Sequence, residues 1–204
     1  MKRYLSTFLA ALVVLSTANT ACAQLAPDAT VKTAVEGTVN AMKADPAARG
    51  GDLAKTTQIV ATHFVPYTDF ERTTRIAAGD AWQNATPEQR KQLFEQFQTL
   101  LVRMYAASLA QLREQNATFK FSASKAAANA RDTVVQSHVL THGGDDAVGY
   151  RLVKTSSGWK IYDINMMGAW LIQIYQKQFA DQLAKGGIDG LIQFLTQHNA
   201  RSTQ

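Results

Sequence analysis

The chain has 204 residues, of which 46% are hydrophobic, a length and composition typical of one globular domain with a substantial core. Its formal charge of +5 comes from 21 basic and 16 acidic residues that are interspersed, so the sequence has no basic block suited to a nucleic-acid backbone. The single cysteine excludes a disulfide scaffold and a cluster of thiolate metal ligands.

The first 23 residues have the three parts of a secretory signal peptide. Lys2 and Arg3 form the positive start, residues 8–15 (FLAALVVL) the apolar centre, and residues 21–23 (ACA) a small-x-small cleavage site. An uncleaved anchor or a core helix is the alternative, but the apolar run is shorter than the roughly 20 residues that span a bilayer. We expect cleavage after Ala23 and export to the periplasm of a single domain, residues 24–204. Loss of the two basic residues lowers its formal charge to +3.

Cys22 raises a second possibility, a lipoprotein acylated on that cysteine. Such sites usually have leucine three positions before the cysteine, where this chain has Asn19. We therefore favour simple cleavage, which leaves a mature chain without cysteine and excludes thiol catalysis in it.

The first half of the mature chain has helical spacing broken by prolines and glycines. The pattern predicts helices over residues 28–43, 52–63 and 68–78, with a loop at 45–51 and a break at Pro66. Residues 86–89 (TPEQ) form a capping box, with Thr86 at the cap and Gln89 reaching back. Apolar residues then recur every three or four positions from Leu93 to Leu112, which predicts a long helix with a wide apolar stripe.

After Asn116 the sequence changes to short alternating runs. Four strands are predicted over residues 118–122, 133–140, 147–154 and 158–164, with turns at 143–146 and 155–158 that make an antiparallel meander. Helices follow over 168–185 and 188–198, separated by Gly186 and Gly187. The fold class is therefore α+β, a curved four-stranded antiparallel sheet wrapped by helices. Such a fold encloses either a filled core or an apolar cavity, and the pattern alone does not separate the two.

Polar residues with catalytic potential are few. The four histidines (63, 138, 142 and 198) are dispersed without metal-ligand spacing, so we interpret them as surface or packing residues and expect no metal. Asp163 lies beside Tyr162 and near Tyr150 of the neighbouring strand, which suggests an isomerase-like acid–base site. Because adjacent strand residues point to opposite faces, we expect that Asp163 and Tyr162 do not share a pocket and that Asp163 pairs with a cation.

Apolar side chains are abundant at positions that face the predicted sheet. Each is either plain core or the wall of a lipid cavity, where methionine suits acyl chains of varied shape. The candidates for a lipid-binding wall are Phe70, Phe94, Phe97, Leu101, Met104, Tyr105, Val148, Tyr150, Trp159, Ile161, Met166, Trp170 and Ile174.

Two stretches together resemble a known family. The first comprises residues 69–72, Ile76, Gly79, Trp82, residues 86–89, Leu100, Leu101 and Tyr105. The second comprises residues 159–164 (WKIYDI), Gly168, Tyr175, Gln178, Phe179, Gly187, residues 190–192 and Leu195. In this order they resemble the MlaC family of periplasmic phospholipid carriers, also known as toluene-tolerance proteins, over nearly the whole mature chain.

The resemblance implies a fold like that of nuclear transport factor 2 (NTF2), with a deep apolar pocket. It implies a monomeric carrier that moves phospholipid between an outer-membrane lipoprotein–porin complex and an inner-membrane ABC transporter, maintaining outer-membrane lipid asymmetry. Phospholipid would be cargo, with no cofactor and no catalytic residue. An NTF2-like envelope enzyme and a purely interacting envelope protein with a filled core are the alternatives.

The chain departs from the family pattern at the start of its penultimate predicted helix. The family often has Gly-x-Ser-Leu there and a Tyr-Arg pair, where this chain has Trp170 at the serine position and Gln176 after Tyr175. A subgroup with a different pocket mouth, including hopanoid-associated relatives, therefore stays open.

Overall fold

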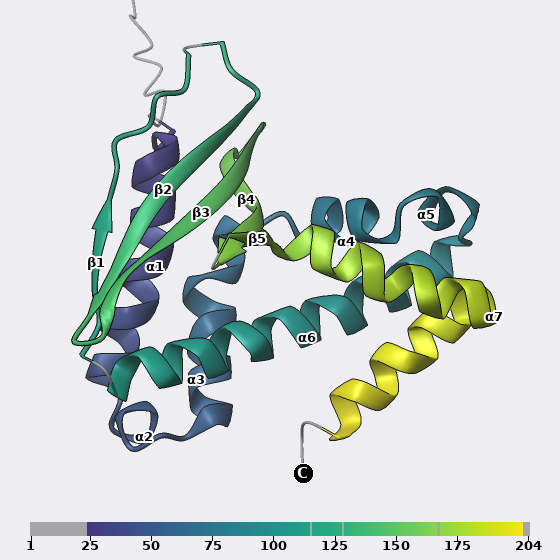
Figure 1. Ribbon diagram of the computed structural model, residues 1–204, viewed down its shortest axis with the longest axis horizontal. Helices are drawn as coiled ribbons and strands as arrows, with labels where there is room; N and C mark the ends of the chain where they lie inside the picture. Colours follow the sequence, from purple (N-terminus) through teal and green to yellow (C-terminus); the bar gives the residue numbers. More distant parts are fainter. Residues whose placement is uncertain (1–23, 115, 128, 167, 202–204) are drawn as a thin grey trace, which may run out of the picture.

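The computed structural model describes residues 24–201 apart from residues 115, 128 and 167. The predicted signal peptide, residues 1–23, lies outside the described residues, as does its cleavage site. The fold is α+β, as predicted, with an open antiparallel sheet and helices around it (Figure 1). No helix within the described part of the chain is long and apolar enough to cross a bilayer.

Helices make up the first half of the described chain, in the order the spacing predicted. They are α1 (Pro27–Ala44), α2 (Pro46–Arg49), α3 (Leu53–His63), the 3₁₀ helix η1 (Val65–Tyr67), α4 (Phe70–Ala78), α5 (Asp80–Asn84) and α6 (Pro87–Glu114). The short helices α2 and α5 were not predicted, because four or five residues are too few to show a helical period. Asp45 caps α2 by accepting hydrogen bonds from two backbone N–H groups, at 2.9 and 3.0 Å.

The capping box at the start of α6 is confirmed. The Gln89 side chain accepts a hydrogen bond from the Thr86 backbone N–H at 3.0 Å, and the Thr86 hydroxyl accepts one from the Gln89 N–H at 3.2 Å. Gly79 separates α4 from α5 with a φ of 59°, a backbone conformation that favours glycine.

The sheet has five strands, one more than predicted. β1 (Thr118–Phe121), β2 (Asp132–Thr141), β3 (Gly144–Thr155), β4 (Gly158–Met166) and β5 (Ala169–Trp170) pair in sequence order, all antiparallel. The prediction missed β5, whose two residues were assigned to the helix that follows. Gly168 has a φ of 82°, so the chain turns there and the helix begins only at Leu171.

The last element, α7, is not one straight helix. α7 (Leu171–Arg201) is kinked at Gly186 and Gly187, whose φ values are −143° and 59°, so its two arms correspond to the two helices predicted on either side of the glycine pair. The register of β3 and β4 shifts between Arg151 and Leu152, which marks a β-bulge in β4 with Tyr162 as the extra residue.

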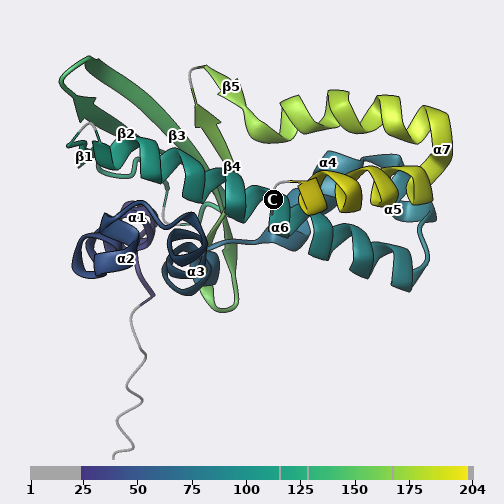
Figure 2. The same cartoon turned by 90° about the horizontal axis from the view of Figure 1, so that it is seen from below.

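The buried apolar residues form two clusters. The sheet-side cluster joins α1, α3, the C-terminal half of α6 and the strands, and includes Val35, Val60, Leu109 and Leu152. The helix-side cluster joins α4, α5, α7 and the N-terminal half of α6. Figures 1 and 2 show the same division, with the sheet and α1 on one side, α4, α5 and α7 on the other, and α6 extending along both. Phe70 packs against both clusters, at the junction between them.

Candidate functional site

An apolar cavity lies at the junction of the two clusters. It is bordered by the end of α3, the start of α4, the middle of α6, β4 and the first turns of α7. Its volume is about 50 Å³, and its lining is almost wholly apolar. The bordering residues are Val60, Phe64, Thr68, Phe70, Thr73, Phe97, Leu101, Val102, Met104, Tyr105, Ser108, Ile161, Tyr162, Asp163, Ile164, Met166, Leu171, Ile172 and Tyr175.

Seven of the thirteen predicted wall residues border this cavity: Phe70, Phe97, Leu101, Met104, Tyr105, Ile161 and Met166. Three others lie in the sheet-side core: Val148, Tyr150 and Trp159. The last three, Phe94, Trp170 and Ile174, do not border it, and Ile174 is exposed. Periodicity identifies which residues face inward, but not how far each one lies from a void.

Sequence reasoning missed several wall residues. Val60 of α3 and Phe64, the residue that ends this helix, were not among the predicted wall residues, and the Phe64 ring stacks on Tyr105 with centroids 4.3 Å apart. Tyr175 belongs to the family-like pattern and packs edge-on against Phe97, with centroids 4.8 Å apart. When two wall residues lie far apart in the sequence, nothing in the sequence indicates that they enclose a void together.

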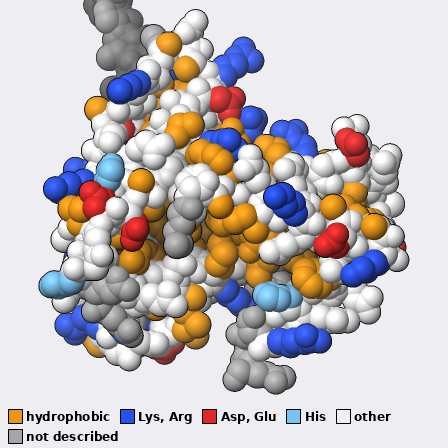
Figure 3. Space-filling view, viewed as in Figure 1, with side chains coloured by type: hydrophobic (Ala, Val, Ile, Leu, Met, Phe, Trp, Pro, Cys, Tyr) orange, Lys and Arg blue, Asp and Glu red, His pale blue; other side chains and the backbone are white. Residues whose placement is uncertain are grey.

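A surface groove adjoins the cavity. The groove has a volume of about 640 Å³ and lies between α3, α6 and both arms of α7. It shares Met104 and Tyr175 with the cavity, and the Tyr175 hydroxyl donates a hydrogen bond to the Met104 sulfur at 3.6 Å. Figure 3 shows hydrophobic side chains gathered near the middle of this face, over α6 and the start of α7. The Met104–Tyr175 contact therefore lies at the boundary between the apolar cavity and the adjoining groove.

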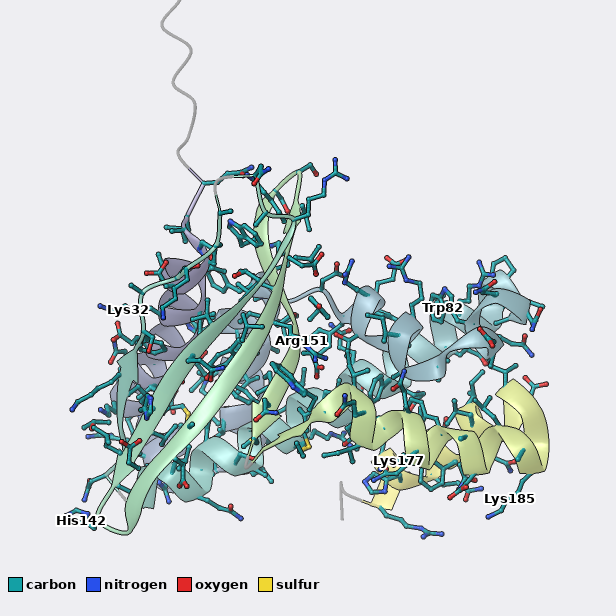
Figure 4. The ribbon with its side chains drawn as sticks, turned by 45° about the horizontal axis from the view of Figure 1, so that its top comes forward. Lys32, Trp82, His142, Arg151, Lys177 and Lys185 are labelled. Carbon is teal, nitrogen blue, oxygen red and sulfur yellow. The ribbon has the colours of Figure 1, made fainter. Side chains whose placement is uncertain are left out.

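A buried carboxylate fixes the start of α7 to the sheet. One Asp163 oxygen accepts hydrogen bonds from the backbone N–H groups of Ile164 and Ile172, each at 3.0 Å, and the other accepts one from Arg151 at 3.1 Å. The Asp163 side chain is fully buried, while that of Arg151 is 32% exposed. The Arg151 guanidinium lies over the Trp170 ring, 3.9 Å from its centroid. Figure 4 places Arg151 at the junction of the sheet with α7.

The expectation that Asp163 pairs with a cation is thus confirmed, but the expectation that Asp163 and Tyr162 do not share a pocket is wrong. Both residues border the cavity, because the bulge at Tyr162 interrupts the strict alternation on which the expectation rested. They still do not form an acid–base pair. The Tyr162 ring packs under the Arg72 guanidinium, 4.5 Å from its centroid. Tyr150 is buried, and burial raises its pKa to about 12.

Burial raises the pKa of Asp163, and the hydrogen bond from Ile172 and the charge of Arg151 only partly offset this. The folded protein therefore binds a proton at this carboxyl more tightly than the unfolded chain does. Stability from this group is present below the unfolded pKa of 3.8 and is lost as pH rises through the folded pKa. We expect the stability margin of the wild type over Asp163→Asn to be larger at pH 4 than at pH 7, measured by urea unfolding at both pH values. A margin that shrinks on acidification would contradict this.

The described residues contain no group of three or more His, Cys, Asp or Glu side chains placed to hold a metal ion. His138 pairs with Asp145 at 2.7 Å on the β2–β3 hairpin. His63 is exposed at the end of α3.

One family model matches most of the described chain. The family model described as MlaC protein matches residues 32–197. A solved structure of a phospholipid-binding protein from Ralstonia solanacearum, in complex with a phospholipid, is similar to this chain with a TM-score of 0.82 and 45% sequence identity. The similarity covers 88% of this chain and 100% of that one. No curated protein matches the chain significantly.

Proposed function

Because the chain belongs to the MlaC family, we propose that it binds phospholipid and carries it between membranes without covalent chemistry. The observation that supports this most directly is the apolar cavity with an adjoining apolar groove, in a fold shared with a protein solved with phospholipid bound. Each CH₂ removed from water contributes about 0.8 kcal/mol, so an apolar wall lowers the barrier to moving acyl chains through an aqueous compartment.

Volume places a condition on this proposal. Pockets for small ligands have volumes of about 300–1,000 Å³, whereas the cavity has only about 50 Å³. Acyl chains therefore enter only if the Met104–Tyr175 contact opens and joins the cavity to the groove of about 640 Å³. Met104 suits this role because its flexible thioether side chain changes rotamer at low cost.

The division of the core supports such an opening. The cavity lies between two separate apolar clusters, so the clusters can move apart along their junction without either one losing its own packing. We propose that docking to a membrane complex drives this movement and that lipid then exchanges.

The cellular setting is part of the same proposal. The signal-like residues 1–23 support export and cleavage after Ala23, and family membership supports a role between an outer-membrane lipoprotein–porin complex and an inner-membrane ABC transporter. In this proposal the pocket is of NTF2 type, the carrier is a monomer that preserves outer-membrane lipid asymmetry, and phospholipid is the cargo.

The hopanoid alternative rested on the departures at Trp170 and Gln176. Trp170 stacks under Arg151, and the Gln176 side chain donates a hydrogen bond to the Ile76 carbonyl at 3.0 Å. Both residues therefore hold α7 in place and do not border the cavity, which gives no reason to assign a different cargo. An enzyme with this fold is less well supported, because Asp163 already accepts three hydrogen bonds.

Native mass spectrometry of the protein, produced with its full N-terminus and purified without detergent, tests this proposal. We expect a polypeptide mass that begins at Gln24, together with a bound species that organic extraction identifies as phospholipid. A bare polypeptide with no phospholipid in the extract would overturn the carrier proposal. A diacylated N-terminus at Cys22 would overturn the proposed release from the membrane.

A further inference from the structure

A second groove lies at the far end of α6 from α7. It is formed by the last turns of α1, by α2, by the end of α6 and by β1, and its volume is about 660 Å³. These four elements meet at the lower left of Figure 1, and Figure 2 shows the same end from below. The groove shares no residue with the cavity or with the groove at Met104 and Tyr175.

The floor of this groove is apolar. Met42 of α1 and Leu109 of α6 are each only 4% exposed, and Val39 and Phe119 are partly buried against the same sheet-side cluster. The groove therefore offers hydrocarbon contact continuous with the core, at a volume within the range of small-ligand pockets.

The rim of the groove is basic. Lys43 and Arg49 are exposed in the last turns of α1 and α2, and none of the described residues that line the groove is acidic. Asp45, the acidic residue nearest in sequence to Lys43, binds the α2 backbone and Lys55, 3.4 Å away, and lines a different hollow. Arg113 donates hydrogen bonds to the carbonyls of Ala48 and Arg49 at 3.0 and 2.7 Å, which fixes α2 beside the groove.

From this combination we infer that the groove is a second binding site, for a single-chain amphiphile with an anionic head. The hydrocarbon chain lies on the floor between Val39 and Leu109, and the head group lies between Lys43 and Arg49. A fatty acid has this chemistry, with one hydrocarbon chain and a carboxylate head. The site is separate from the proposed phospholipid cavity, so either can be wrong without the other.

The probe of the site is laurate, used below its micelle concentration. Its neutral ester monolaurin is the matched ligand without the anionic head. Binding is measured by equilibrium dialysis on delipidated protein. Each protein also carries Leu101→Trp, a change in the cavity wall, so that the measured binding reports on the groove. Exposed ion pairs each contribute about 0.2–1 kcal/mol, so the loss of two weakens binding by about two- to thirtyfold. We expect Lys43→Gln with Arg49→Gln to weaken laurate binding by roughly that factor and to leave monolaurin unchanged.

The control is Lys32→Gln with Lys91→Gln, which removes the same charge from exposed positions of α1 and α6 outside every groove described above. Figure 4 shows Lys32 on α1. Equal laurate affinity in the two double variants would overturn the inference, and so would loss of all laurate binding in Leu101→Trp alone. Phospholipid extraction from wild-type protein reports on the cavity separately.

Discussion

Substituting Leu101 by tryptophan is expected to remove at least nine-tenths of the phospholipid that is extracted from the purified protein. Leu101 is 7% exposed in the middle of α6 and borders the cavity. The larger side chain occupies the space that an acyl chain needs, and each displaced CH₂ forfeits about 0.8 kcal/mol, so the loss of two or three methylene contacts weakens binding by at least tenfold. The measurement is phospholipid per mole of protein, by organic extraction and mass spectrometry.

Two comparisons keep this result interpretable. Overpacking a core usually costs about 1–3 kcal/mol, so thermal unfolding must first show that the variant is folded. Ser108→Phe adds bulk at a partly buried position of the same wall and should lower lipid content in the same direction. Gln111→Trp adds the same indole at an exposed position of α6, away from the cavity, and should retain lipid at the wild-type level. Wild-type lipid content in both wall variants would mean that the cargo binds elsewhere.

The sequence predicted the elements that carry a strong local signal. α6 combines a capping box with a long apolar stripe, and both are present in the structure. The strands were found because turn residues separate alternating runs, and Tyr150, Trp159 and Ile161, which were predicted to face inward, are buried. Local hydrogen bonding and period were enough for these elements.

What the sequence did not predict depends on contacts between distant segments. The bulge at Tyr162 changes which side chains share a face, and no residue near it, such as a strand glycine, signals it. The stripe of α6 contains both Phe94 and Phe97, yet only Phe97 borders the cavity, because α7 packs over that part of the helix. Whether an inward residue meets a void or another side chain is decided by how two apolar clusters meet, which periodicity does not encode.

The cavity and the buried carboxylate occupy the same junction, and this links lipid binding to stability. Asp163 borders the cavity and binds the first turn of α7, which also supplies Leu171, Ile172 and Tyr175 to the wall. An opening along the junction therefore has to proceed without breaking the Asp163 contacts, or it has to break them at considerable cost. The Met104–Tyr175 contact is the weaker boundary, because a hydroxyl–thioether hydrogen bond is weak and one partner is a flexible side chain.

Substituting Asp163 by alanine is expected to lower the stability of the fold by roughly 3–5 kcal/mol. The change leaves the backbone N–H groups of Ile164 and Ile172 without their acceptor in a buried place and removes the partner of Arg151. For a domain of this size each kcal/mol shifts the melting temperature by about 2–4 °C, so a fall of roughly 6–20 °C is expected.

The matched control is Asp132→Ala, which removes an Asp–Arg pair between β2 and α4. Asp132 binds Arg72 at 3.0 Å, but its side chain is 48% exposed, so its loss should cost no more than about 1 kcal/mol. Calorimetry of the two variants compares a buried pair with an exposed one. Equal melting temperatures would mean that Asp163 does not hold α7 against β4, and the boundary of the cavity would then have to be sought in the packing of Phe97, Tyr175 and Phe179 alone.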